Sequence, residues 1–248
     1  MNYICSVANE QVKHVVGLQD KSYRQEHGQF IAQGTRACTQ LLQTYNPVVI
    51  YITQDYYKTP DAAQLHDFDD IIIGVSQHVM DKMSTAKNAS GICAIFTIPD
   101  EKPLPQQGPG LVLSHISDPG NLGTLIRTAA AMNIKEIILI NCTDPYSPKV
   151  VQSTAGCMTT INLYQTTWQL LQKQQLELCA LVVHGGKTPD QIDLKNRFLV
   201  VGNEAHGLSS QEVQSCKQAM TIPMPGHAES LNAAIAGAIG LYLMTQQN

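Results

Sequence analysis

The sequence of 248 residues predicts an α/β protein, with a parallel sheet in its C-terminal part and a smaller α/β domain before it. Apolar runs rich in β-branched residues alternate with stretches of helical period along most of the chain. The C-terminal runs are continuously apolar, which indicates a sheet covered on both faces. Residues 97–110 break the alternation with four prolines and two glycines. We therefore place a linker at 98–109, between domains at 1–97 and 110–248.

The elements follow from these patterns. In the first domain we expect strands at 48–52, 71–75 and 92–98, and helices at 35–45 and 76–83. In the second domain we expect strands at 111–116, 137–140, 178–183, 198–201 and 220–222. The helices between them are expected at 122–133, 148–158, 167–175, 210–217 and 231–245. Ligands of such sheets bind beyond the carboxyl ends of the strands, so the strand-to-helix loops are the candidate sites.

Composition restricts the function. The formal net charge of −4 argues against a protein that relies on general phosphate attraction, so any nucleic-acid contact must be local. Seven cysteines without a Cys-x-x-Cys pair suit a reducing compartment. No histidine cluster has ligand spacing, and no apolar stretch approaches the roughly 20 residues that cross a bilayer. We therefore expect a cytoplasmic protein with neither a metal nor a membrane partner.

The first polar loop, SHISDPGNLGTLIR, follows the strand at 111–116. Asp118 to Gly120 form a sharp turn, and Asn121 is expected to cap the next helix. Arg127 stands in the second helical turn among apolar and small residues, where a guanidinium needs a partner. The alternatives are a solvated arginine and a simple cap.

The second loop, FLVVGNEAHGLS, leaves a buried strand at Gly202. Its glycines permit close approach of the backbone to a ligand. The spacing is not that of a phosphate loop, because Leu208 and Ser209 stand where lysine and a hydroxyl residue are required. Glu204 is either a site carboxylate or a surface one, and we assign no role to His206.

The third segment, MTIPMPGHAESLNAAIAGAIGLYL, turns at Pro-Met-Pro-Gly and enters a helix. Ser230 is expected to cap this helix, and Asn232 either caps it or faces a partner. The body of the helix is rich in alanine and glycine, which predicts close packing against another helix, a crossing of the chain or a second subunit.

Together and in this order, the three segments resemble the motifs of the SpoU (TrmH-like) RNA ribose methyltransferases of the SPOUT superfamily. The matching residues are Asn121-x5-Arg127, Gly202-Asn203-Glu204-x-x-Gly207, and Ile222-Pro223-Met224 with Ser230-Leu231-Asn232. DPYSPKVVQSTAGC (144–157) is similar to the family segment between the first two motifs. KSYRQEHGQFIAQG (21–34) is more weakly similar to the start of a ribosomal-protein-like substrate-binding domain. Ala32-Gln33-Gly34 stand where that domain usually has Val-Glu-Gly.

The resemblance implies a trefoil-knotted α/β domain, a homodimer across the knot, and transfer of a methyl group from S-adenosylmethionine to a ribose 2′-hydroxyl in ribosomal or transfer RNA. By position, it implies a cofactor pocket formed by Gly202, Asn203, Ile222, Met224 and Leu231. The catalytic and RNA-facing set would be Asn121, Arg127, Glu204, Ser230 and Asn232. A guanidinium, which keeps its proton at physiological pH, suits an electrostatic role for Arg127 better than that of a general base.

Two other functions remain open. A non-catalytic RNA-binding protein would keep the knotted fold, although all five residues of the catalytic set are present. An oxidoreductase is disfavoured because no Gly-x-Gly-x-x-Gly follows a strand. In the first domain, Lys13, Lys21, Arg24 and Arg36 are candidate RNA contacts. A merely solvated face is the alternative, because Glu10, Asp20 and Glu26 lie nearby.

Overall fold

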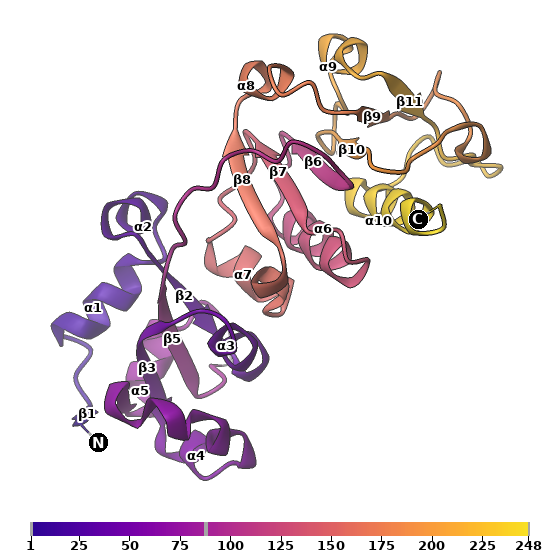
Figure 1. Cartoon of the computed structure of the whole chain (residues 1–248). Coiled ribbons are helices and arrows are strands. Elements are labelled where there is room, and N and C mark those ends of the chain that lie inside the picture. Colours follow the sequence, from indigo (N-terminus) through magenta and orange to yellow (C-terminus); the bar gives the residue numbers. More distant parts are fainter. Residues whose placement is uncertain (1, 87–88, 248) are drawn as a thin grey trace. The chain divides into compact units, whose positions relative to one another are not determined.

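The computed structural model describes residues 2–86 and 89–247, which form two compact units (Figure 1). The first comprises Met1–Asp100 together with Asp144–Thr159, and the second comprises Glu101–Thr143 and Thr160–Asn248. The predicted α/β fold is confirmed in both units. The trefoil knot and the domain boundaries drawn from the sequence stay predictions.

The first unit has a mixed sheet of order β1-β4-β3-β5-β2, in which β5 runs in the opposite direction to the other four strands. Its strands are β1 (Asn2–Ile4), β2 (Gln29–Gln33), β3 (Pro47–Thr53), β4 (Ile72–Val75) and β5 (Ile92–Thr97). Its helices are α1 (Glu10–Gly17), α2 (Lys21–His27), α3 (Thr35–Leu42), α4 (Gln54–Tyr57), α5 (Gln77–Met83) and α7 (Pro148–Thr154), with a 3₁₀ segment at Pro60–Ile71. The predicted strands β3, β4 and β5 and helices α3 and α5 are confirmed.

A segment from the second half of the sequence completes the first unit. α7 packs against β2 and α3, and the ring of Tyr146 lies 5.1 Å from that of Phe30. Arg24 is only 2% exposed, and its Nε donates to Asp144 Oδ2 at 2.9 Å. Its Nη1 donates to the Leu18 carbonyl at 2.8 Å.

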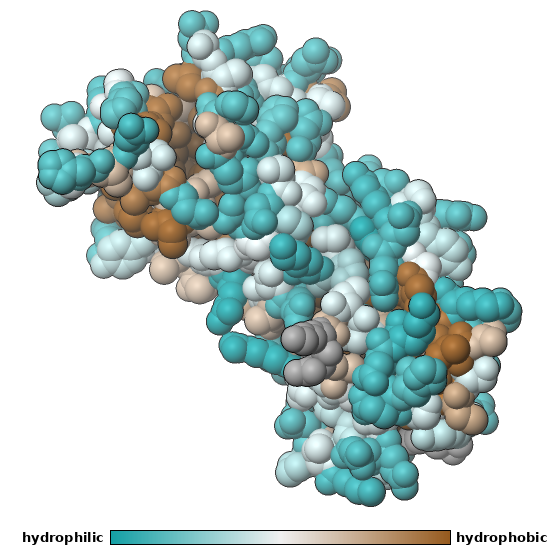
Figure 2. Space-filling model, turned by 180° about the vertical axis from the view of Figure 1, so that it is seen from behind, coloured by the Kyte–Doolittle hydropathy of each residue, from teal (hydrophilic) through white to brown (hydrophobic). Residues whose placement is uncertain are grey.

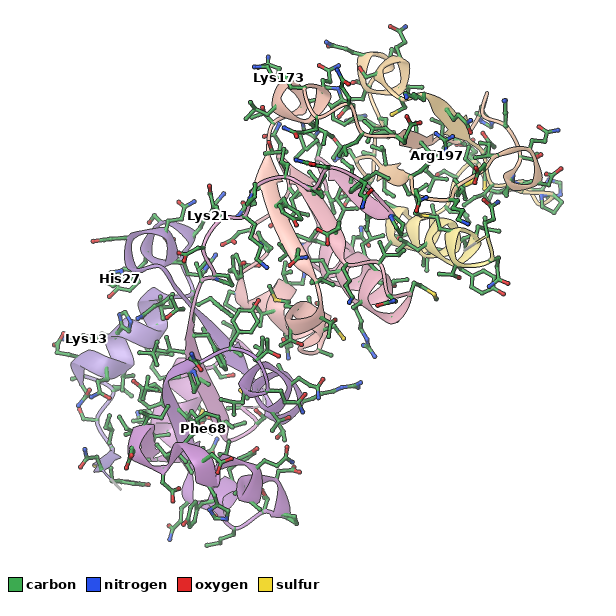
Figure 3. The ribbon with its side chains drawn as sticks, in the orientation of Figure 1. Lys13, Lys21, His27, Phe68, Lys173 and Arg197 are labelled. Carbon is green, nitrogen blue, oxygen red and sulfur yellow. The ribbon has the colours of Figure 1, made fainter. Side chains whose placement is uncertain are left out.

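The hypothesis that Arg24 contacts RNA is therefore wrong, because the buried guanidinium is already paired inside the unit. Lys13 and Lys21 do lie on the exposed surfaces of α1 and α2 (Figure 3). Lys13 forms an ion pair with Glu10 at 2.7 Å.

The second unit has six strands in the order β11-β9-β10-β6-β7-β8, all parallel. They are β6 (Gly110–Ser114), β7 (Glu136–Ile140), β8 (Asn162–Thr166), β9 (Leu178–Leu181), β10 (Phe198–Val201) and β11 (Gln218–Met220). Its helices are α6 (Pro119–Ala131), α8 (Trp168–Gln172), α9 (Ser210–Ser215) and α10 (Ala233–Thr245), with a 3₁₀ turn at Pro189–Gln191. Another 3₁₀ turn, Cys157–Thr160, spans the point where the chain passes from the first unit into the second. Every residue of β6 and β10 is buried, as the continuous apolar runs predicted.

The glycines of α10 account for its close packing on α6 and β10. A Cβ at Gly237 would lie 2.3 Å from Leu125 Cδ2, and one at Gly240 would lie 2.5 Å from Leu199 Cδ2. A neighbouring helix and strand thus fill the small-residue face. Of the helices described here, none has the length and apolar character needed to cross a membrane.

Hydrophobic side chains are also left at the surface of the second unit, at Leu170, Val183, Ile235 and Tyr242. Figure 2 shows hydrophobic surface gathered on this unit, at the left of the view. Ile235 and Tyr242 are seven residues apart on α10, about two helical turns, so they lie on the same side of that helix.

Candidate active site

Three segments of the second unit converge beyond the carboxyl ends of β6 and β10. The two strands are neighbours in parallel register, with Val201 opposite Leu113. The loop after β6 leads into α6, the loop after β10 begins at Gly202, and the segment after β11 leads into α10. The parallel arrangement thus brings the three motifs to one edge of the sheet.

The carboxylate of Glu204 is the centre of this region. It accepts hydrogen bonds from the backbone N–H groups of Ser117 and Asp118 at 3.2 and 3.1 Å, and from the Ser117 hydroxyl at 3.2 Å. The side-chain amides of Asn121 and Asn203 also donate to it, at 3.1 and 3.4 Å. Five hydrogen-bond donors therefore surround the two oxygens of one carboxylate.

These donors set the protonation state of Glu204. Partial burial acts to raise the pKa of this carboxyl, but the hydrogen bonds from Asn121 and from backbone N–H groups outweigh burial and lower it below its ordinary value. Glu204 is thus a fixed negative charge at neutral pH. It orients its neighbours and is poorly suited to take up a proton.

Asn121 and Asn232 extend the network to the third motif. The Asn232 amide donates to Asn121 Oδ1 at 3.2 Å, and the Asn121 amide donates to Glu204 Oε1. A continuous chain of hydrogen bonds, Asn232–Asn121–Glu204, thus joins residues from all three motifs. The prediction that these three residues belong together has a direct structural basis.

The helix caps differ from those predicted. Asp118, and not Asn121, caps α6, because its Oδ1 accepts from the Asn121 backbone N–H at 2.8 Å. Asn232, and not Ser230, caps α10, because its Oδ1 accepts from the Ala234 and Ile235 backbone N–H groups. The helix α10 thus starts two residues later than predicted, and Asn232 both caps it and faces Asn121.

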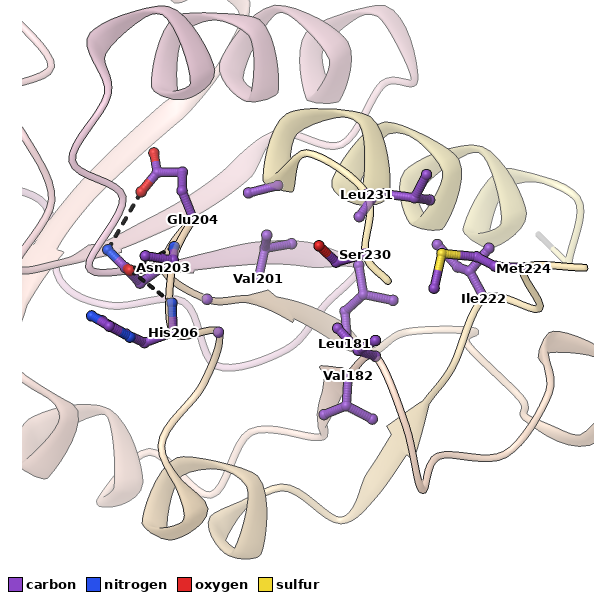
Figure 4. Close-up of a pocket in the computed structure, with 16 residues that line it drawn as sticks. Leu181, Val182, Val201, Asn203, Glu204, His206, Ile222, Met224, Ser230 and Leu231 are labelled. Atoms are coloured by element: carbon purple, nitrogen blue, oxygen red, sulfur yellow. Dashed lines mark hydrogen bonds between the residues drawn. The ribbon is translucent and has the colours of Figure 1, made fainter. Parts of the chain in front are cut away.

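A cavity of about 240 Å³ lies beside the network (Figure 4). In Figure 4, apolar side chains such as Leu181, Ile222 and Met224 lie at one end, and the polar residues Asn203 and Glu204 lie at the other. Glu204 lines this cavity, and so do six more residues predicted for cofactor binding or catalysis, namely Gly202, Asn203, Ile222, Met224, Ser230 and Leu231.

Gly202 is required by the loop that borders the cavity. Asn203 and Gly207 exchange backbone hydrogen bonds at 3.1 and 2.9 Å, which closes a tight turn. A Cβ at Gly202 would lie 2.4 Å from the Gly207 carbonyl carbon and 2.5 Å from the Leu208 nitrogen. Only glycine fits there without displacing the backbone.

Arg127 lies apart from this set. The expectation that it is packed among apolar residues is wrong, because α6 buries Leu122, Leu125, Ile126 and Ala129 and leaves Arg127 exposed. Within the described parts of the chain it makes no hydrogen bond or ion pair, and it does not line the cavity. The guanidinium is thus free to meet a group from outside this chain.

His206, to which the sequence analysis assigned no role, is exposed. Its backbone N–H donates to Asn203 Oδ1 at 3.1 Å, and in Figure 4 its ring lies away from the apolar end of the cavity. Among the described residues, no three or more His, Cys, Asp or Glu are grouped to hold a metal ion.

Sequence reasoning missed a second carboxylate behind the site. Glu212 is 7% exposed, and its side chain accepts from the Ser114 hydroxyl and from the Ser209 hydroxyl and N–H. It thereby ties the end of β6 to the loop after β10. The capping box of Ser209 and Glu212 is visible in the sequence, but the contact with Ser114, 98 residues away, is not.

Comparison with known proteins places these features in a family. Residues 109–242 match the SpoU rRNA Methylase family, and residues 9–94 match the MRM3-like substrate binding domain. An uncharacterized tRNA/rRNA methyltransferase of Synechocystis is 33% identical over 98% of this chain and 93% of its own length. The 23S rRNA (guanosine(2553)-2′-O)-methyltransferase RlmP of Bacillus subtilis is 26% identical over 98% of each chain.

A solved structure agrees with the family matches and with the two relatives. The AdoMet-bound rRNA methyltransferase from Sinorhizobium meliloti superimposes with a TM-score of 0.85 at 28% identity, over 99% of this chain and 97% of that one. The fold and the converging motifs define a methyltransferase with an appended substrate-binding domain. The chain belongs to the SpoU rRNA methylase family.

Proposed function

We propose that this protein transfers a methyl group from S-adenosylmethionine to a ribose 2′-hydroxyl in ribosomal or transfer RNA. The observation that carries the proposal is the hydrogen-bond chain Asn232–Asn121–Glu204 beside a cavity at the carboxyl edge of a parallel sheet. The Bacillus subtilis relative, a 2′-O-methyltransferase of 23S rRNA that is matched over nearly its whole length, supports the same reaction.

The cavity fits S-adenosylmethionine in its chemistry. Its apolar end, at Leu181, Ile222 and Met224, suits a flat base, and its polar end suits a charged amino-acid portion (Figure 4). Gly202 lines the cavity with its backbone alone, because the turn at Gly207 and Leu208 fills the space where a side chain would stand. We assign cofactor binding to Gly202, Asn203, Ile222, Met224 and Leu231. The bound cofactor would supply an electrophilic methyl group on a sulfonium.

The residues of this chain would align the reacting groups. Displacement at a methyl carbon requires the ribose oxygen to approach in line, so the donor geometry must be fixed beforehand. Glu204 fixes the loop after β6 through Ser117 and Asp118, and it fixes Asn121 in the first turn of α6. Ser230 lines the cavity and is exposed, which leaves its hydroxyl available to the RNA.

Arg127 would act on the RNA. Its exposed guanidinium would hold a phosphate or the 2′-oxygen and stabilise the negative charge that develops on that oxygen as its proton passes to solvent water. The oxygen would then bond to the methyl carbon as the carbon–sulfur bond breaks and leaves a neutral thioether. An exposed arginine that has no partner in the described part of its chain suits this role better than a buried one. We expect a homodimer to complete the site and the exposed side of α10 to contribute to its interface. We also expect the enzyme to act in the cytoplasm, on the ribosomal or transfer RNA proposed as its substrate.

The test combines methyl transfer with cofactor binding. The purified protein is incubated with methyl-labelled S-adenosylmethionine and total RNA from cells that lack it, and 2′-O-methyl sites are mapped. We expect Arg127→Ala to abolish transfer while the affinity for S-adenosylhomocysteine changes by less than about twofold. Lys135→Ala, another exposed cation of the same unit, is the matched control. Cofactor and RNA binding without transfer by the wild type would favour a non-catalytic RNA-binding protein.

A further inference from the structure

Three rings of the first unit form an ordered cluster on α1 and α2 that plays no part in the site described above. The imidazole of His27 stacks on Tyr23, with centroids 4.0 Å apart and planes 21° from parallel. His14 lies tilted against both rings, at 5.5 Å from Tyr23 and 5.1 Å from His27. A Cβ at Gly17 would lie within 2.9 Å of three Tyr23 ring atoms, so the tyrosine is held between the backbone of α1 and His27.

Hydrogen bonds hold each ring in place. His14 Nε2 contacts Gln29 Oε1 at 2.8 Å, and since that oxygen only accepts, Nε2 carries the proton. His14 Nδ1 then accepts from the Tyr23 hydroxyl at 3.1 Å. His27 Nδ1 likewise donates to the Tyr23 carbonyl at 3.0 Å, which leaves Nε2 of His27 without a proton in the neutral ring. The orientation of His27 is thus set before any ligand arrives.

The exposed member of the cluster is His27. Tyr23 and His14 are partly buried, whereas His27 is exposed at the end of α2, next to the left-handed Gly28 that terminates the helix. Among the described residues no ring stacks on the other side of His27, because its ring contacts are Tyr23 and the tilted His14. A preorganised flat ring on an exposed side chain is the kind of surface on which unpaired RNA bases stack.

The charges around the cluster favour contact with a base over general attraction to phosphate. Lys21 is exposed and without an ion pair in the described chain, but Asp20 precedes it, Glu26 stands on the same helix, and Lys13 is paired with Glu10. Figure 3 shows Lys13, Lys21 and His27 on α1 and α2. A surface with little net charge gains most from contact with the face of a base, because stacking does not depend on neutralising phosphates.

We propose that the exposed imidazole of His27, supported by Tyr23, is a stacking platform for an unpaired nucleobase of the RNA substrate. The inference rests on the proposed function for the identity of that substrate as RNA. It predicts that the first unit prefers RNA with a bulged or looped-out base to a continuous duplex.

The test uses the full-length protein and two fluorescent RNA hairpins that share one stem, with and without a bulge of three adenosines. Binding is measured by anisotropy at fixed salt. We expect the wild type to prefer the bulged hairpin and His27→Ala to lose about 5- to 100-fold in affinity for it, with little change for the paired one. His27→Phe should retain the preference, because phenylalanine stacks but cannot donate a hydrogen bond.

Three results would overturn the inference. They are a wild type that binds both hairpins alike, a His27→Ala variant that loses affinity for both equally, and a His27→Phe variant as weak as His27→Ala. Methyl transfer to total RNA is measured in parallel with the wild type. Transfer without any effect of His27 rejects the platform alone, whereas absence of transfer rejects the proposed function whatever the hairpins show.

Discussion

The importance of Glu204 lies in the number of donors around its carboxylate. Ser117, Asp118, Asn121 and Asn203 all point N–H or O–H groups at it, and only a group that accepts on both oxygens satisfies them. The sequence identified Glu204 and Asn121 as candidates from their motifs. It could not show that Glu204 serves mainly as an acceptor, because that follows from a loop 86 residues away.

Replacing Glu204 by glutamine tests this role. The new NH₂ group would face donors in place of one oxygen, so we expect methyl transfer to fall at least tenfold and the free energy of unfolding to fall by about 1–3 kcal/mol. Activity assays and urea unfolding at pH 7 measure the two effects. Glu101→Gln, an exposed glutamate of the same unit, is the control and should match the wild type. Full activity in the Glu204 variant would show that the network is dispensable.

The hydrogen bonds to Glu212 predict that the free energy of unfolding depends on pH. Burial acts to raise the pKa of this carboxyl, but hydrogen bonds from Ser114 and Ser209 outweigh burial and lower it below its ordinary value of 4.5. A depressed folded-state pKa means that the carboxylate stabilises the fold above the unfolded-state pKa, and that this stability is lost as the pH falls through the folded-state value.

We therefore expect the free energy of unfolding of the wild type to decline as the pH falls below about 4.5, and Glu212→Gln to show a smaller decline. Chemical unfolding followed by circular dichroism from pH 7 to 3 measures both slopes. Glu101→Gln should keep the wild-type slope. Equal slopes for Glu212→Gln and the wild type would mean that Glu212 has an ordinary pKa in the folded protein.

At the scale of elements, the sequence predicted the buried strands well and the edge strands poorly. β6 and β10 are fully buried apolar runs, and both were predicted. β8 is at the edge of its sheet and mixes polar with apolar residues, so its pattern did not distinguish it from a loop. β1 and β2 are edge strands of the first sheet and were missed for the same reason.

Gly202 gives the sharpest prediction about a loop. Gly202→Ala forces the turn between Asn203 and Gly207 open, because the new Cβ meets main chain and not a movable side chain. We expect affinity for S-adenosylhomocysteine to fall at least tenfold and the melting temperature to fall by several degrees. Gly226→Ala is the matched control for stability, since no atom lies within 4 Å of its Cβ, and it should melt as the wild type does. Calorimetry measures both properties.

At the scale of the whole molecule, a segment that follows the first motif in the sequence packs in the other unit. Asp144 and Tyr146 follow the first motif in the sequence, yet they pack in the first unit against Arg24 and Phe30. The sequence showed Arg24 only as a basic residue, a candidate RNA contact or part of a solvated face. Its burial arises because Asp144, 120 residues later, supplies the countercharge, and such a pairing has no local signal.

The exposed side of α10 carries the last prediction, which concerns assembly. Ile235 and Tyr242 are 52% and 51% exposed two turns apart, on a helix whose opposite side is buried against α6 and β10. A large apolar surface left on an otherwise packed helix marks an association site. Placing a glutamate at each position would leave the fold intact, because both side chains are already exposed, but would put like charges at the proposed symmetric interface.

We expect Ile235→Glu/Tyr242→Glu to sediment as a monomer at concentrations where the wild type sediments as a dimer. Methyl transfer should fall with dissociation, because Arg127 has no partner within its own described chain and we assign completion of the site to the dimer. Leu170→Glu changes a side chain on α8 that is 49% exposed and should affect neither property. A monomeric wild type with full activity would separate catalysis from assembly and leave Arg127 to act on RNA within a single chain.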